Sequence, residues 1–383
     1  DIFVSAAGDI DFDGGDSNSF AQIGHGGFAD GGTRTDRWGG SSAAHRRSND
    51  RGYRPATRSG NIDVQSGGDI LFNAGNNDGE LGFAQIGHGG RQVAANPWAS
   101  AYGDGHSGNI DVSATGEILF EGGSRRGDYI MIGHGGYETF GNHGGDGSDN
   151  RLNSDILVEA GDGVTFKATG ISNTNTARNF AQIGHGGWRS SFRDVQDMDG
   201  NLFAILGGYD NGGLVANNAG RNPWEPYTTN PDGLALDFLT GRPINEVVPG
   251  TENFITPTGT STVGPATLGT FMGNITVRTT NAGGDIRMLA PSEAEGTIYG
   301  NAGESYAQIG HGGFRTFGDV VGNITVESAG GIDFNAVQGD GTRTANHVAA
   351  YALLGHGGYE SGGEYHGDIT VSSVDTISFV GGN

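Results

Sequence analysis

The sequence predicts an all-β fold: a single-stranded parallel β-helix (β-solenoid) with three short strands per coil, about seven coils and long loop insertions. Two repeated phrases and a high glycine content predict it. One phrase alternates apolar and polar residues, and the other, "FAQIGHGGF" at 20–28, returns five more times in close or looser form. The chain holds 75 glycines among 383 residues, and glycine suits repeated turns better than helices.

The alternating phrase predicts the first two strands of each coil. It reads "NIDVQSGGDILF" at 61–72 and "NIDVSATGEILF" at 109–120, and its two-residue period is typical of strands with one buried face. The Gly, Asn and Asp residues between its halves predict a corner. Seven copies put Ile, Val and then Phe or Met at equivalent positions, which predicts stacking of like on like in a dry core. Two adjacent rungs of this core ladder are Ile62, Val64 and Phe72, and Ile110, Val112 and Phe120.

The second phrase predicts a third strand and the corner after it. A catalytic motif is needed once, so six copies indicate a structural period. Stacked coils would place the histidines in one column, about 4.8 Å apart. The column comprises His25, His88, His134, His185, His311 and His356. A second column, which predicts an amide ladder, comprises Gln22, Gln85, Gln182 and Gln308.

The histidine column has a structural and a metal-binding interpretation. A neutral imidazole donates and accepts at once, so the rings can bond along the column or to backbone at a corner. Histidine is also a common metal ligand, but no Cys, Asp or Glu recurs inside the phrase to complete a coordination shell. The structural interpretation is favoured. The alternation does not decide which face of this third strand is buried.

The whole chain, 1–383, is expected to form one β-solenoid domain with insertions. The longest insertion, 188–272, contains seven of the ten prolines and is rich in Thr and Gly, which predicts an arm that emerges from the solenoid and binds something. A second insertion, 28–59, is rich in arginine, a residue suited to interfaces, and genomic base composition is the alternative explanation of the preference for arginine over lysine. The residues expected at contacts between subunits are Arg34, Arg37, Arg46, Arg47, Arg51 and Trp224.

Composition limits the partners. The formal net charge of −23 argues against nucleic acid, because phosphate binding needs a basic surface. No apolar run approaches the roughly 20 residues that span a bilayer, and the absence of cysteine excludes disulfides. No cofactor is expected, with calcium as the one alternative. "DVQDMDGN" at 194–201 places Asp194, Asp197 and Asp199 as in a fragment of a calcium loop, without the closing Glu.

The repeated G-[ND]-I-x-V … G-x-I-x-F pattern resembles the repeat regions of filamentous haemagglutinin-type exoproteins of bacteria, the adhesins of two-partner secretion. The resemblance covers the seven strand pairs. It implies a right-handed parallel β-helix, secretion, and a role in surface adhesion or matrix building. The "AQIGHGG" phrase and the 188–272 arm are not part of that pattern, and no catalytic residue carries over.

The sequence favours a non-enzymatic extracellular structural protein. The chain opens inside a strand, "DIFV", and closes just after another, "ISFVGGN", so its end rungs are expected to be uncapped. Uncapped ends predict either a segment of a longer solenoid or subunits that stack head to tail into a surface or matrix filament. The favoured partner is another copy of this chain, bound head to tail. The alternatives are a segment of a secreted adhesin that binds glycans or cell surfaces, and a polysaccharide-active β-helix enzyme, although no coil shows a distinct acidic cluster.

Overall fold

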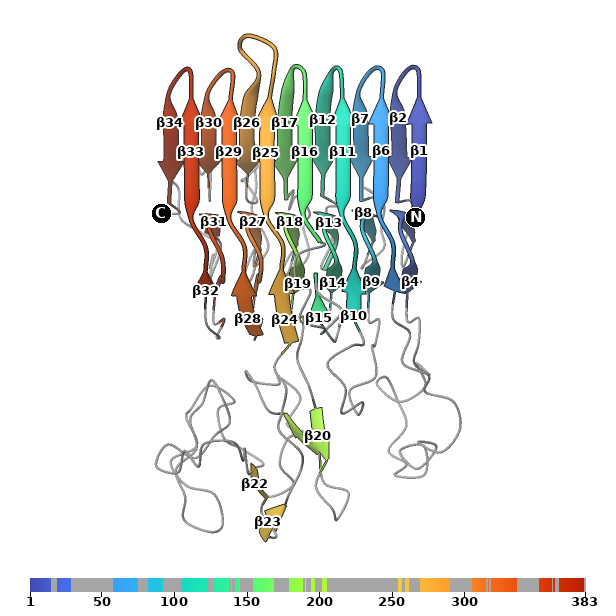
Figure 1. Ribbon diagram of the computed structural model, residues 1–383, viewed down its shortest axis with the longest axis vertical. Coiled ribbons are helices and arrows are strands. Elements are labelled where there is room, and N and C mark those ends of the chain that lie inside the picture. The colour runs from blue at the N-terminus through green and yellow to red at the C-terminus, as the bar shows by residue number, and fades with distance from the viewer. Residues whose placement is uncertain are drawn as a thin grey trace, which may run out of the picture.

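The structure is a computed structural model. It describes residues 1–14, 19–28, 58–74, 82–91, 105–122, 127–137, 139, 142–144, 154–168, 179–188, 190, 194–196, 202–204, 254–256, 259–261, 269–289, 305–314, 316, 318–335, 351–359, 361 and 365–381. Within these ranges the chain is all-β and contains no helix, and its strands stack in parallel, which confirms the predicted fold class (Figure 1).

Three long sheets correspond to the three predicted strands. Sheet A has seven strands: β1 (Ile2–Ala6), β6 (Ile62–Ser66), β11 (Ile110–Ala114), β16 (Ile156–Ala160), β25 (Ile275–Thr279), β29 (Ile324–Ser328) and β33 (Ile369–Ser373). Sheet B has seven: β2 (Ile10–Asp13), β7 (Ile70–Asn73), β12 (Glu117–Glu121), β17 (Gly163–Lys167), β26 (Asp285–Leu289), β30 (Ile332–Asn335) and β34 (Ile377–Val380). Sheet C has six: β3 (Phe20–Ile23), β8 (Phe83–Ile86), β13 (Tyr129–Ile132), β18 (Phe180–Ile183), β27 (Tyr306–Ile309) and β31 (Tyr351–Leu354).

Two further sheets were not predicted. Sheet D contains β4 (Gly26–Phe28), β9 (Gly89–Arg91), β14 (Gly135–Tyr137) and β19 (Gly186–Trp188), and bridges through Gly312 and Gly357 extend it. Sheet E contains β5 (Arg58–Ser59), β10 (Gly105–Ser107), β15 (Asn142–His143), β24 (Gly269–Met272), β28 (Gly318–Val321) and β32 (Tyr365–His366). These strands are two to four residues long and lack an alternating apolar pattern. The sheet D strands lie where the sequence predicts only a corner of the repeated phrase, and the sheet E strands lie where it predicts loops.

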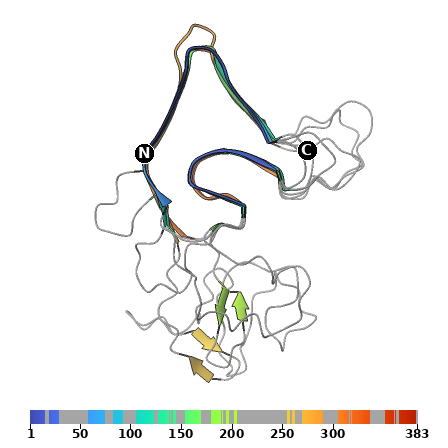
Figure 2. The same cartoon turned by 90° about the vertical axis from the view of Figure 1, so that its right-hand side faces the viewer.

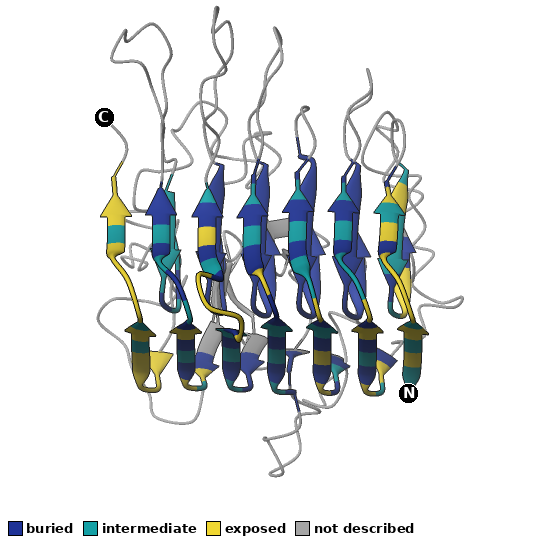
Figure 3. Cartoon of the chain, turned by 90° about the horizontal axis from the view of Figure 1, so that it is seen from above, coloured by how far each residue is buried: buried dark blue, intermediate teal, exposed yellow. Residues whose placement is uncertain are grey.

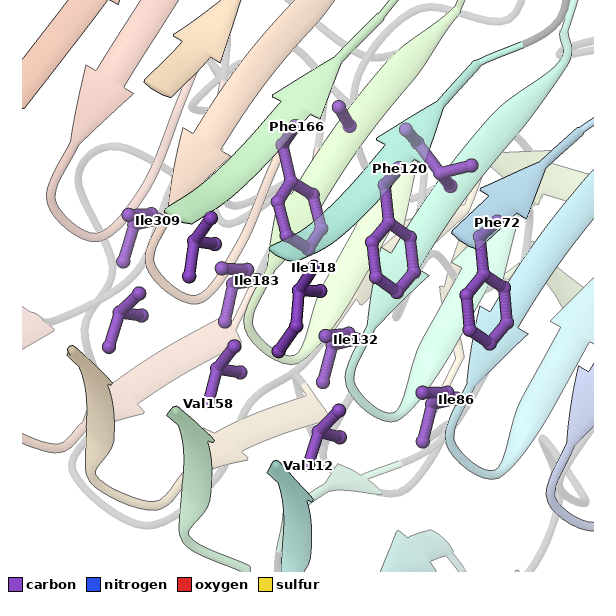
Figure 4. Close-up of a cluster of buried hydrophobic side chains, with 14 of the residues drawn as sticks. Phe72, Ile86, Val112, Ile118, Phe120, Ile132, Val158, Phe166, Ile183 and Ile309 are labelled. Carbon is purple, nitrogen blue, oxygen red and sulfur yellow. The ribbon is translucent and has the colours of Figure 1, made fainter. Parts of the chain in front are cut away.

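The coils lie over one another without a shift in register. Ile62 pairs with Ile110 and Ile110 with Ile156, and the Val and Phe columns follow the same rule. Rings in the Phe column lie close and nearly parallel; the Phe72–Phe120 and Phe120–Phe166 centroids are each 4.4 Å apart (Figure 4). Seen along the stack, the successive coils superimpose (Figure 2). Identical neighbours in one column therefore fix the register.

The solenoid has two apolar cores. Buried Ile, Val, Phe and Ala side chains of sheets A, B and C form the first core, which includes all six core-ladder residues expected from the sequence. The second core lies on the other side of sheet C. It contains Phe83, Tyr129, Met131, Tyr137, Phe180, Trp188, Tyr306 and Phe314. Strands of sheet C, such as β8, are therefore buried on both faces, which answers the question that alternation left open.

Most of the predicted insertions lie outside the described residues, including the arginines at 34–51 and Trp224. Two antiparallel pairs belong to the 188–272 segment: β20 (Asp194–Gln196) with β21 (Leu202–Ala204), and β22 (Phe254–Thr256) with β23 (Gly259–Ser261). The final residues of that segment, Gly269–Met272, form β24 of sheet E, so the solenoid resumes earlier than expected. In the part of the chain that the structure describes, no helix is long and apolar enough to cross a membrane.

Candidate functional site

The repeated phrase folds into a β-arc, which we define as a sheet C strand, a Gly-His corner and a sheet D strand. The two strands of one arc pair with the next coils rather than with each other. The corner requires glycine. Gly133 has φ +154°, and a Cβ there would lie 1.9 Å from the carbonyl oxygen of Gly184 in the next coil. The arcs therefore stack in direct backbone contact.

The histidines of the phrase join the arcs to one another. The backbone N–H of each histidine donates to Nδ1 of the histidine in the next coil; from His88 to His134 and from His134 to His185 the distance is 3.0 Å. The same bond runs from His25 to His88, from His185 to His311 and from His311 to His356. The rings stack with centroids 4.8 to 5.1 Å apart. All bonds point in one direction along the axis.

The second ring nitrogen ties the arc to the start of its own coil. Nε2 of His134 lies 2.8 Å from the carbonyl oxygen of Gly108, and Nε2 of His185 lies 2.7 Å from that of Ser154. Because Nδ1 accepts and a carbonyl cannot donate, Nε2 carries the proton and the ring is neutral. Burial favours this form and lowers the pKa of His88 to about 4 and that of His311 to about 3.

Both nitrogens of the bonded histidines are thus in use, which leaves no lone pair for a metal ion. Among the described residues, no group of three or more His, Asp or Glu side chains is placed to hold one. Of the candidate calcium ligands, Asp197 and Asp199 lie outside the described residues, and only the backbone of Asp194 is described. The histidine column is a ladder in which hydrogen bonds link each bonded imidazole to backbone groups of its own coil and of the preceding coil.

The glutamines fill the inside of the arcs. Nε2 of Gln182 donates to the carbonyl oxygens of Gly310 and Gly312 in the next coil, each at 3.1 Å. Gln22, Gln85 and Gln308 make the equivalent pair of bonds. Each amide therefore bridges two carbonyls at the corner of the following arc. The second of them, such as that of Gly312, also accepts a backbone N–H, here from Gly187.

Tyrosine and glutamine occur together across neighbouring coils. The Tyr306 hydroxyl donates to Oε1 of Gln182 at 3.0 Å, and the Tyr129 hydroxyl to Oε1 of Gln85 at 3.3 Å. Where Met131 replaces the glutamine, the next coil carries Phe180, which has no hydroxyl to satisfy. In these three interior pairs Tyr follows Gln and Phe follows Met. The end coils differ, because Phe83 follows Gln22, and Tyr351 follows Gln308 without a hydrogen bond between their side chains.

A double-mutant cycle tests this pairing. We expect Gln182→Met to lower the free energy of unfolding by about 2 kcal/mol, because it leaves the buried Tyr306 hydroxyl without an acceptor. Adding Tyr306→Phe should restore about 1 kcal/mol, since it recreates the Met131–Phe180 arrangement. Urea unfolding of the four proteins measures the coupling. Additive effects of the two changes would contradict the pairing.

A third polar ladder lies at the corner before sheet A, where an Asn or Asp precedes each Ile. The backbone N–H of each such residue donates to the side chain of its counterpart in the preceding coil, as from Asn109 to Oδ1 of Asn61 and from Asp155 to Oδ1 of Asn109, both at 3.0 Å. Asn323 and Asp368 continue the series. This ladder also has a single direction.

No protein-family model matches this chain, and neither does any curated protein or solved structure. The site is therefore characterised by its geometry: three polar ladders and two apolar cores whose repeated groups bond or pack from coil to coil.

Proposed function

We propose that this chain is a non-enzymatic structural protein, a β-solenoid subunit that stacks head to tail into an extracellular filament. The histidine ladder carries the proposal. In rings such as that of His134, both nitrogens are hydrogen-bonded to backbone groups. The bonds between coils all run in the same direction, so the pattern can repeat without limit along the axis. Such an arrangement suits a rigid rod better than a reactive site.

The end rungs support coaxial stacking on a second copy. The interior residue Phe120 is fully buried, whereas its counterpart Phe379 in β34 is 57% exposed and Ile369 in β33 is 49% exposed (Figure 3). A copy whose β1 pairs with β33 would place Ile2 over Ile369 and continue the apolar column.

The extracellular location in this proposal comes from the resemblance of the strand pairs to filamentous haemagglutinin-type exoproteins. The test is electron microscopy of the native sample together with its mass under dissociating conditions. We expect fibres of the solenoid's width that dissociate into single chains. Discrete monomers without fibres would overturn the filament, and saturable glycan or cell binding by those monomers would favour the adhesin alternative.

A pair of variants makes the test specific. Ile369→Lys puts a charge on the inward face of the end strand β33, and we expect it to abolish fibres while the circular dichroism spectrum stays unchanged. Ser372→Lys puts the same charge on the exposed outer face of that strand and should leave the fibres intact. Equal effects of the two variants would argue against stacking through β33.

A further inference from the structure

A second group of imidazoles lies apart from the histidine ladder. His106 on β10 is in register with Arg58 on β5 and with His143 on β15, and His143 is in register with Phe271 on β24. The rings of His106 and His143 are stacked with centroids 5.2 Å apart, and those of His143 and Phe271 with centroids 5.5 Å apart. The four residues form one column on sheet E, whose strands β10, β15 and β24 lie side by side in Figure 1.

The paired imidazoles are buried and lack hydrogen bonds. Both His106 and His143 are 0% exposed, and none of their four ring nitrogens has a hydrogen-bond partner. A buried polar group without a partner is rare and costs roughly 1–3 kcal/mol. These rings contrast with His134, whose two nitrogens are both bonded. Apolar rings at these two positions would pack equally well without the cost of four unbonded nitrogens. The imidazoles therefore point to a role beyond packing.

The surroundings of the pair oppose a positive charge. The described groups that face it are Arg58 from β5 and three ladder histidines at the corners after β8, β13 and β18: His88, His134 and His185. The Thr139 carbonyl is the one group that favours charge on His143, and no hydrogen bond forms. No described carboxylate acts on either ring. Burial accordingly lowers the pKa of His106 far below its ordinary value and that of His143 to about 3.

The backbone holds this part of sheet E weakly. β5 and β15 are two residues long and β10 is three, against five for each strand of sheet A. Short strands contribute few ladder hydrogen bonds, so side-chain packing in the Arg58–Phe271 column supplies much of the local stability. Segments with these properties open first when a protein opens locally.

We infer that His106 and His143 form an acid-sensitive latch, which holds β5, β10 and β15 against the arcs while both rings are neutral and releases them when a ring takes a proton from water. A protonated ring would lie next to Arg58 and a second imidazole without an acceptor, so the charge is relieved only by opening. Sheets A, B and C do not contain the pair and remain closed.

Hydrogen exchange of the intact chain tests the latch. Protection factors, corrected for the intrinsic exchange rate at each pH, are compared for amides of β10 and of β11. Below about pH 6.5, each proton taken up on opening should raise the opening constant of β10 about tenfold per pH unit. The first effect of acid should appear in β10 while β11 still holds its protection.

The matched variant is His106→Phe with His143→Phe, which extends the natural Phe271 along the column. We expect its β10 protection to be independent of pH over the same range. If the double change prevents folding, His143→Phe alone should halve the slope. His366→Phe, the same substitution at an exposed position of sheet E, should behave as the parent chain. Equal pH slopes in the parent and the variant, or simultaneous loss of protection in β10 and β11, would overturn the latch.

Discussion

Gly133→Ala is expected to lower the free energy of unfolding by more than about 4 kcal/mol. The added Cβ would lie 1.9 Å from the carbonyl oxygen and 2.6 Å from the carbonyl carbon of Gly184, and φ at this position is +154°. Both atoms belong to backbone, so the side chain cannot be accommodated by a rotamer change. The coils would have to separate, which breaks the neighbouring bond from the Gly184 N–H to the Ile132 carbonyl oxygen. Urea unfolding followed by circular dichroism measures the loss.

Gly8→Ala is the matched control. Gly8 is exposed, no atom lies within 4 Å of a Cβ built on it, and its φ is not positive. We expect it to be neutral or stabilising by less than about 1 kcal/mol, because alanine restricts the unfolded chain. A Gly133→Ala protein as stable as Gly8→Ala would mean that the arcs do not touch through their backbones.

Acid is expected to open β5, β10 and β15 first and then to unfold the remaining coils cooperatively, well above the pH at which carboxylates titrate. Burial lowers the pKa of seven histidines in the fold: His88, His106, His134, His143, His185, His311 and His356. Each is neutral when folded and takes up a proton near pH 6.5 when unfolded. Their contribution is therefore complete above pH 6.5 and is lost as the pH falls from 6.5 towards the folded pKa, which is about 4 for His88 and about 3 for His311.

The free energy of unfolding is expected to fall steeply as the pH is lowered. Each buried ladder histidine removes about 1.4 kcal/mol of stability per pH unit in this window. The five of them, which leaves out the latch residues His106 and His143, together remove on the order of 7 kcal/mol per unit. Unfolding free energies measured between pH 8 and pH 5 give the slope. The substitution His311→Met removes one ladder imidazole. It should lower the free energy of unfolding at pH 8 and reduce its pH dependence by about 1.4 kcal/mol per pH unit. A flat profile between pH 6.5 and pH 5.5 would contradict the neutral ladder.

The alternating phrases contained enough information to predict sheets A and B, because identical residues at Ile62, Ile110 and Ile156 permit only one register. The third strand was predicted as well, but its double burial was not. That depends on a second core built from the first residue of the phrase, such as Phe180, and the aromatic after it, such as Trp188. Only the folded arc brings these two positions together.

Other features left no pattern in the sequence. Sheet E strands such as β5 are too short to show a period, and they pair only because the coils beneath them already stack. His106 and His143 stand at unequal distances from the repeats, so no alignment of phrases brings them together. The histidine ladder, by contrast, was visible as a column. Its bonding partners, the carbonyls of Gly108 and Ser154, were not.

Cysteine cross-linking tests the stacking of coils most directly, because the chain has no cysteine of its own. Leu71 on β7 is in register with Leu119 on β12, and Leu119 with Thr165 on β17, all on the outer face of sheet B. Adjacent rungs about 4.8 Å apart fall within the Cα separation of a disulfide, and rungs two coils apart do not. We predict rapid oxidation of the Leu71→Cys, Leu119→Cys protein to an intramolecular disulfide and none in Leu71→Cys, Thr165→Cys. Equal oxidation of the two proteins, or none in the first, would contradict the stacked solenoid.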